Sequence, residues 1–148
     1  MNKKLKNTDA LKFIFAGNSS VTFLNNKTEN RFSYRVKMAK NSNIFFVSVL
    51  TDNEYSYLGT VSNGFYKHGN KSNLAPGSQG EKVFIYVLKN LKSNSLSDFI
   101  EIWHEGKCGK CNRPLTVPSS IETGIGPECF KKLSKLERRD VFLNLILE

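Results

Sequence analysis

The chain has 148 residues, the length of one domain, and 39% of them are hydrophobic, so we expect an ordinary core without disulfide staples. No apolar run approaches the ~20 residues of a membrane-spanning helix, and the short apolar patch after the basic start is a poor signal peptide. Three clustered cysteines also argue against a secreted disulfide framework. We therefore expect a cytoplasmic protein with no membrane association.

The net charge is +9, and it is unevenly distributed. Residues 1–50 hold nine Lys/Arg and two Asp/Glu, residues 51–104 hold five of each, and residues 105–148 hold eight and six. A basic first third is typical of a surface that binds nucleic acid or another polyanion. The alternative is compositional, because AT-biased coding also enriches a chain in Lys, Asn, Ile and Phe.

Residues 1–10 are expected to form a flexible arm. From about residue 13 to residue 68, short runs of β-branched and aromatic residues separated by Asn, Gly and Asp predict strands. Asn63-Gly64 is a strong hairpin signal, so neighbouring strands should be antiparallel. The predicted strands cover residues 21–24, 31–38, 44–50, 55–62 and 65–68.

After the predicted strands, the spacing of the apolar residues becomes that of a helix. Apolar residues from Val83 to Leu91 recur at intervals of three and four, which predicts a helix over about 79–91 with one stripe packed on the sheet. Ser78 and Glu81 match a capping box, in which the Ser78 hydroxyl accepts from the first-turn amides. Residues 92–97 form a polar linker, and residues 99–103 predict one more strand.

That strand leads into the most informative segment, which contains all three cysteines. His104, Cys108, Cys111 and Cys129 have the spacing H-x3-C-x2-C-x17-C, and four such ligands complete a tetrahedral zinc shell. Pro127 suits the first position of a helix, which places Cys129 in its first turn. A knuckle followed by a ligand on a helix N-terminus is typical of a treble clef.

The second helix ligand of a treble clef is replaced here by Lys132, so His104 is expected to complete the set. Four protein ligands leave no position for water, which predicts a structural zinc and a protein that is not an enzyme. The zinc-deaminase signature fails, because Glu105 directly follows His104. If His104 were not a ligand, three thiolates and a water beside Glu105 would reopen a catalytic interpretation.

The segment from Trp103 to Cys129 resembles a family of uncharacterised bacteriophage and bacterial proteins whose C-terminal zinc-finger-like segment reads C-G-R-C-G-R-x-L-T-x-P-x-S-x-x-x-G-x-G-P-x-C. Upstream runs from Thr22, Arg31, Phe46 and Tyr57 are similar to its N-terminal part, so the resemblance covers about residues 12–130. Lys110 and Asn112 stand where Arg and Gly are usual. The resemblance implies a phage or mobile-element origin, the host cytoplasm as location, and a zinc.

The strand over residues 31–38 alternates in character. Its odd positions carry cations and its even positions are apolar, so one face should be basic and the other buried. The alternative is an ordinary solvated outer face. Including the cations beside the knuckle, the candidate nucleic-acid-binding residues are Arg31, Arg35, Lys37, Lys107, Lys110, Arg113, Lys131 and Lys132.

The predicted fold class is α+β: an antiparallel sheet with one packed helix over residues 11–97, then a treble-clef-like zinc module with a C-terminal helix over residues 98–148, in one compact unit. The apolar C-terminal helix can also form a homodimer contact. We expect a non-enzymatic, zinc-binding accessory protein that is associated with nucleic acid. The alternative is a protein-binding module, such as a phage-encoded inhibitor of a host defence or polymerase complex.

Overall fold

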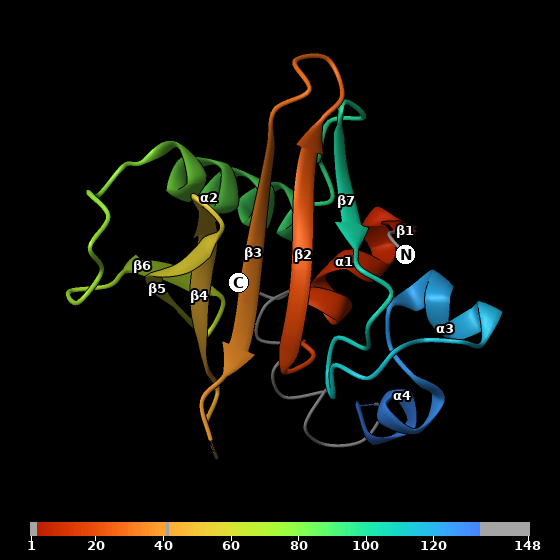
Figure 1. Ribbon diagram of the computed structural model, residues 1–148. Coiled ribbons are helices and arrows are strands. Elements are labelled where there is room, and N and C mark those ends of the chain that lie inside the picture. Colours follow the sequence, from red (N-terminus) through yellow and green to blue (C-terminus); the bar gives the residue numbers. More distant parts are fainter. Residues whose placement is uncertain (1–2, 41, 134–148) are drawn as a thin grey trace.

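A computed structural model describes residues 3–40 and 42–133 (Figure 1). The described residues form seven strands and four helices, and the predicted antiparallel sheet is confirmed. The elements in chain order are β1 (Lys3–Leu5), α1 (Asn7–Ile14), β2 (Asn18–Asn25), β3 (Arg31–Met38), β4 (Ile44–Thr51), β5 (Glu54–Ser62), β6 (Phe65–His68), α2 (Gln79–Lys92), β7 (Ile100–His104), α3 (Pro118–Thr123) and α4 (Pro127–Leu133).

The sheet order is β1-β7-β2-β3-β4-β5-β6, with every neighbouring pair antiparallel. β2 to β6 follow one another as a meander, as expected from the hairpin signals. β7, the last strand among the described residues, is inserted between β1 and β2, with His104 opposite both Lys3 and Val21. The cysteine segment that follows β7 is therefore tied directly to the start of the chain.

One face of the sheet is covered by α1 and α2, which lie behind it in Figure 1. The core between α2 and the sheet is aromatic: the Tyr34 ring centre lies 5.0 Å from that of Phe23 and 5.2 Å from that of Phe84. The Tyr34 hydroxyl donates to the carbonyl of Gly80 at 2.7 Å, which fixes the start of α2 over β3. The opposite face, which we call the outer sheet face, carries no helix of the described residues.

Two predictions are wrong for the described residues: the flexible N-terminal arm and the packing of a single helix on the sheet. Residues 3–10, expected to belong to a flexible arm, form β1 and the first half of α1, and Ala10 is fully buried. The apolar positions of α1 span only two turns, and β1 forms by pairing with a strand that is distant in the sequence. Local sequence patterns therefore do not predict either element. The sheet is consequently covered by two helices rather than one.

The capping prediction at α2 is also wrong in detail. The Ser78 side chain makes no cap hydrogen bond, and its buried hydroxyl has no partner among the described residues. Glu81 instead accepts from the amide of Gly77 at 2.7 Å and is bound by Tyr66 and His68. The predicted helix after residue 134 and its dimer contact lie outside the described residues. No helix within the described ranges is long and apolar enough to span a membrane.

Candidate metal centre and basic sheet face

Three cysteine sulfurs come together beyond the end of β7. The Sγ atoms of Cys108, Cys111 and Cys129 all lie within 4.8 Å of one another, and all three thiols are free. Thiolates about 2.3 Å from one zinc in a tetrahedron are separated by roughly 3.8 Å, so the three sulfurs fit around a single ion. Cys108, Cys111 and Cys129 thus form a group that can hold a metal ion.

Short backbone contacts shape this cluster. The Cys108 amide donates to the Arg113 carbonyl at 2.8 Å, and the Asn112 amide donates to the Cys108 carbonyl at 2.9 Å, which closes the knuckle turn. Asn112 adopts a left-handed φ of 63° within it. Cys129 is the third residue of α4, and Pro127 is the first, as the sequence predicted. The knuckle and a helix start therefore supply the three sulfurs.

The environment favours a thiolate at Cys108. Burial alone raises the pKa of this thiol, but backbone amides of Gly126, Cys111 and Lys110 donate to its sulfur, and the net pKa lies below its ordinary value. Burial and the two neighbouring sulfurs raise the pKa of Cys129 to about 12. A cation among the sulfurs would reverse that increase, because it favours thiolates at all three positions.

His104 does not join the three sulfurs, contrary to the four-ligand prediction. Its ring is fully buried, its Nε2 lies 2.6 Å from the Ile121 carbonyl, and its Nδ1 accepts from the Gly106 amide at 2.9 Å. Nε2–H is therefore the donor of a neutral imidazole, and burial lowers the pKa of His104 accordingly. His104 ties β7 to α3 instead of facing the cluster.

Phe13 of α1 packs against the segment that carries the metal-ligand cluster of Cys108, Cys111 and Cys129. Its ring centre lies 5.5 Å from that of His104, and it touches the knuckle and the end of α3. A Cβ built on Gly109 or Gly124 would lie 2.8 Å or 2.4 Å from the Phe13 ring, so only glycine fits at these two positions. The helix that local patterns missed thus supports the predicted metal segment.

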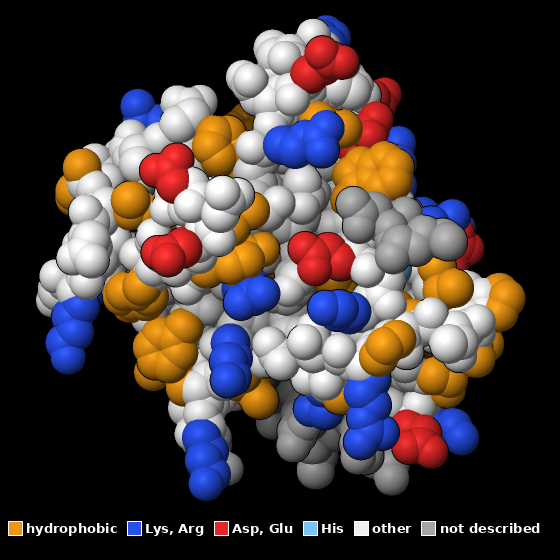
Figure 2. Space-filling view, viewed as in Figure 1, with side chains coloured by type: hydrophobic (Ala, Val, Ile, Leu, Met, Phe, Trp, Pro, Cys, Tyr) orange, Lys and Arg blue, Asp and Glu red, His pale blue; other side chains and the backbone are white. Residues whose placement is uncertain are grey.

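The outer sheet face carries the predicted cations of β3. Tyr34 and Val36 are fully buried, whereas Arg31, Arg35 and Lys37 are exposed, so the predicted alternation is confirmed. Figure 2 shows this face, with Lys and Arg side chains interspersed among hydrophobic ones.

Aromatic rings lie beside these cations. The Arg35 guanidinium carbon lies 4.1 Å from the centre of the Tyr55 ring, and Phe46 packs against Tyr57 with ring centres 6.2 Å apart. Burial and the nearby Glu105 carboxylate raise the pKa of Tyr55, while Arg35 opposes them. Glu105 therefore faces the outer sheet face and is not among the residues of the metal-ligand cluster.

The other predicted nucleic-acid-binding residues form a second group around the knuckle and α4. Lys107 and Arg113 are exposed, Lys110 is half-buried near Gly17, and Lys131 is exposed on α4. Lys132 belongs to α4, but its side chain is outside the described part of the structure. The predicted cations thus form two groups, one on β3 and one around the knuckle and α4.

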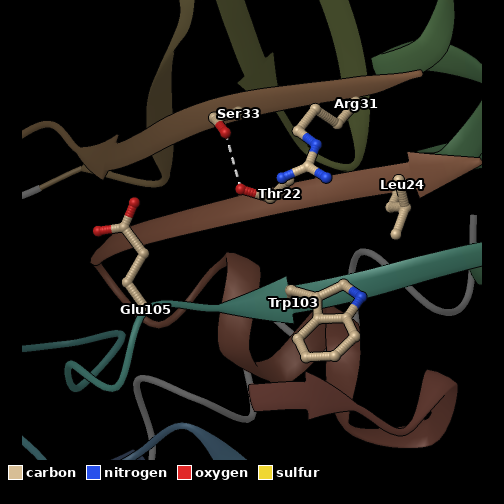
Figure 3. Close-up of a pocket in the computed structure, with 6 residues that line it drawn as sticks. All are labelled: Thr22, Leu24, Arg31, Ser33, Trp103 and Glu105. Atoms are coloured by element: carbon tan, nitrogen blue, oxygen red, sulfur yellow. Dashed lines mark hydrogen bonds between the residues drawn. The ribbon is translucent and has the colours of Figure 1, made fainter. Parts of the chain in front are cut away.

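Sequence reasoning missed a groove on the outer sheet face, where β2, β3 and β7 lie side by side. It has a volume of about 350 Å³, and its floor contains a hydroxyl pair, with Thr22 Oγ1 and Ser33 Oγ 2.7 Å apart. The alternation of side chains along each strand shows which residues face this side of the sheet. Only the non-local pairing of β2 with β7 brings these residues together in one groove. The groove is lined by Thr22, Leu24, Arg31, Ser33, Trp103 and Glu105 (Figure 3).

The fold and the cluster define a mixed α/β domain with an antiparallel sheet and a three-cysteine metal-ligand group. Residues 103–134 match the model of a family of unknown function (DUF6011), and this range contains His104 and all three cysteines. No curated protein and no solved structure matches the chain.

Proposed function

We propose that this is a non-enzymatic accessory protein that holds a structural zinc and binds single-stranded nucleic acid on its outer sheet face. The observation that carries the proposal is the row Arg31, Arg35 and Lys37, exposed on β3 beside the rings of Tyr55 and Tyr57. Cations along a groove or face bind phosphates, and exposed rings stack on bases of any sequence. The bases of a duplex are already stacked on one another and are not available to these rings. The arrangement therefore favours a single-stranded ligand.

Zinc is the metal that the donor set favours, because three cysteine sulfurs are soft ligands and Cys-rich knuckles are common zinc sites. Bound by Cys108, Cys111 and Cys129, the ion would link the knuckle to α4 in a treble-clef-like arrangement. The three sulfurs leave a fourth tetrahedral position to a further ligand. The segment has few large apolar side chains, so metal binding would contribute much of its folding free energy.

A structural role for the zinc is supported by the position of Glu105. The carboxylate that a catalytic interpretation would use lies on the outer sheet face near Tyr55, and it is not grouped with the three sulfurs. General acid–base catalysis requires the carboxylate within hydrogen-bond reach of the reacting group. The phage or mobile-element origin and the cytoplasmic location remain predictions that rest on the resemblance.

Binding of labelled single-stranded DNA and RNA, followed by fluorescence anisotropy over a range of salt concentrations, tests this function. Replacing Arg31, Arg35 and Lys37 by Gln should weaken binding and reduce the salt slope by about 2, since each single-strand phosphate contact contributes about 0.7. The matched control removes three exposed lysines outside β3, which are Lys71 in the loop before α2 and Lys82 and Lys89 on α2, and should retain most of the slope. Absence of binding at low salt would contradict the proposal.

A protein partner is the second candidate, and one observation favours it. Large apolar side chains are exposed on strands of the same sheet, and Phe65 is 62% exposed. The exposed apolar side chains of β4 and β6 are Ile44, Phe46, Leu50 and Phe65. A pull-down from nuclease-treated host lysate tests this alternative: loss of every partner after nuclease contradicts it, as does equal capture by a variant with Phe46 and Phe65 replaced by Ser.

A further inference from the structure

The groove between β3 and β7 differs from the rest of the outer sheet face, because it offers charges of both signs. Arg31 and Glu105 both line it, and Figure 3 shows Glu105 and Leu24 at opposite ends, with Arg31 and Trp103 on opposite sides. A groove that only followed phosphates would gain nothing from a carboxylate. Its volume of about 350 Å³ suits a single nucleotide rather than a longer segment.

The aromatic side of the groove is held in place. Trp103 Nε1 donates to a Glu101 carboxylate oxygen at 3.0 Å, and the other Glu101 oxygen accepts from Asn26 at 3.0 Å and lies 3.9 Å from Lys4. These contacts orient the indole without occupying its faces. An oriented, half-buried indole is well suited to stack on a nucleobase.

The two charged side chains of the groove suit different parts of a nucleotide. The Arg31 side chain extends from β3 over β2, and within the described ranges it has no acidic group at ion-pair distance, so its charge suits a phosphate. The Glu105 carboxylate can accept two parallel hydrogen bonds from a base edge. Among the four common bases, guanine alone presents two adjacent donors, N1–H and N2–H2, on its Watson–Crick edge.

We infer that this groove is a nucleotide subsite that prefers guanine, with the base stacked on Trp103, its Watson–Crick edge on Glu105 and its phosphate on Arg31. The inference deepens the proposed function and rests on it. The Thr22 and Ser33 hydroxyls lie on the floor and add polar contacts that any base can use. The rest of the outer sheet face then binds the neighbouring nucleotides without regard to sequence.

Trp103 is the only tryptophan of the chain, so its fluorescence reports on this groove alone. The probes are an all-thymine single strand and the same strand with one central guanine. The guanine strand should quench Trp103 and bind about tenfold more tightly, the usual scale of one bidentate contact to a base. Glu105→Gln should remove this preference, so that the two strands bind equally, whereas Arg31→Gln should weaken both strands and keep the preference.

Glu122→Gln, the same change at an exposed site on α3, is the matched control and should retain the preference. Equal binding of both strands to the unmodified protein would overturn the guanine subsite while leaving the proposed function intact. If neither strand binds at low salt, the proposed function fails, and the subsite then survives only if guanosine monophosphate by itself quenches Trp103. Quenching that persists unchanged in Glu105→Gln would also overturn the assignment.

Discussion

Arg35 and Tyr55 stack across two strand spacings on the outer sheet face, with 4.1 Å between the guanidinium carbon and the ring centre. β4 lies between their strands, and Arg35 is opposite Ser48, which is opposite Tyr57. A planar guanidinium over a phenol is a rigid arrangement, because Arg stacks on aromatic faces as Lys does not. The pair therefore presents a cation and an aromatic surface in a fixed relationship.

Charge and stacking at this pair should be separable in binding measurements. Tyr55→Leu should weaken single-strand binding by about 1–3 kcal/mol without changing the salt slope, because a stacking surface is lost and no phosphate contact is. Arg35→Gln should reduce the slope by about 0.7. Anisotropy titrations at several salt concentrations measure both. Tyr86→Leu on α2, where the ring is 43% exposed, is the control; equal losses in it and in Tyr55→Leu would contradict a stacking role.

Metal binding should depend on the three cysteines and not on His104. Cys108→Ser, Cys111→Ser and Cys129→Ser should each lose zinc, whereas His104→Phe should retain one zinc per chain. His104→Phe should still be less stable by about 1–3 kcal/mol, since it leaves the Gly106 amide and the Ile121 carbonyl without partners. Metal content by atomic absorption and urea unfolding measure the two effects. A folded His104→Phe protein without zinc would restore the four-ligand prediction.

Metal removal should affect the segment after β7 more than the sheet. The sheet has its own aromatic core around Tyr34 and Phe84, whereas a metal held by the three sulfurs would link the knuckle to α4. Chelation of zinc should therefore increase amide hydrogen exchange around Cys108 and Cys129 and leave Val36 and Val47 protected. Equal loss of protection throughout would show that the metal stabilises the whole domain.

The sequence predicted β3 to the residue and β4 to β6 within one residue, because each follows its neighbour and the pattern is local. It also predicted the cysteine cluster, since ligand spacing carries the chemistry directly. Three features required non-local pairing instead: β1, the position of β7 inside the sheet, and the packing of α1 beneath the knuckle. His104 failed as a ligand for the same reason, because spacing does not show that its ring points at Ile121.

The contact between Phe13 and Gly124 predicts a large effect from one methyl group. Gly124 has a φ of 78°, and an added Cβ would lie 2.4 Å from the Phe13 ring, so Gly124→Ala should displace α3 and weaken zinc binding. Gly77→Ala is the matched control, because its φ of 81° is similar and its nearest atom is the end of Lys82 at 3.8 Å.

Gly77→Ala should cost only the backbone strain of about 1–2 kcal/mol. Gly124→Ala should exceed that in urea unfolding of the zinc-loaded protein, and it should lower the zinc affinity in competition with a chelator. Equal destabilisation of the two variants would show that Phe13 does not support the metal module. Phe13→Ala should weaken zinc binding in the same direction, with a loss of about 3–5 kcal/mol in stability.

The buried Glu81 predicts a specific dependence of stability on pH. Burial alone raises its pKa, but Tyr66, the Gly77 amide and His68 donate to the carboxylate and hold the net pKa below its ordinary value of 4.5. A carboxyl group with a lowered pKa in the fold stabilises it above the ordinary pKa, and this stabilisation is lost as the pH falls through the lowered value.

The difference in unfolding free energy between the unmodified protein and Glu81→Gln should thus be about 1–3 kcal/mol at neutral pH. It should shrink as the pH falls below 4.5, since protonation of Glu81 then removes from the unmodified protein the charge that Glu81→Gln already lacks. Urea unfolding at neutral and acid pH measures it, and zinc loss in acid cancels because both proteins keep the three cysteines. Glu54→Gln, an exposed matched change on β5, should show no such difference. A difference that stayed constant into acid would mean that the Glu81 charge contributes nothing to stability.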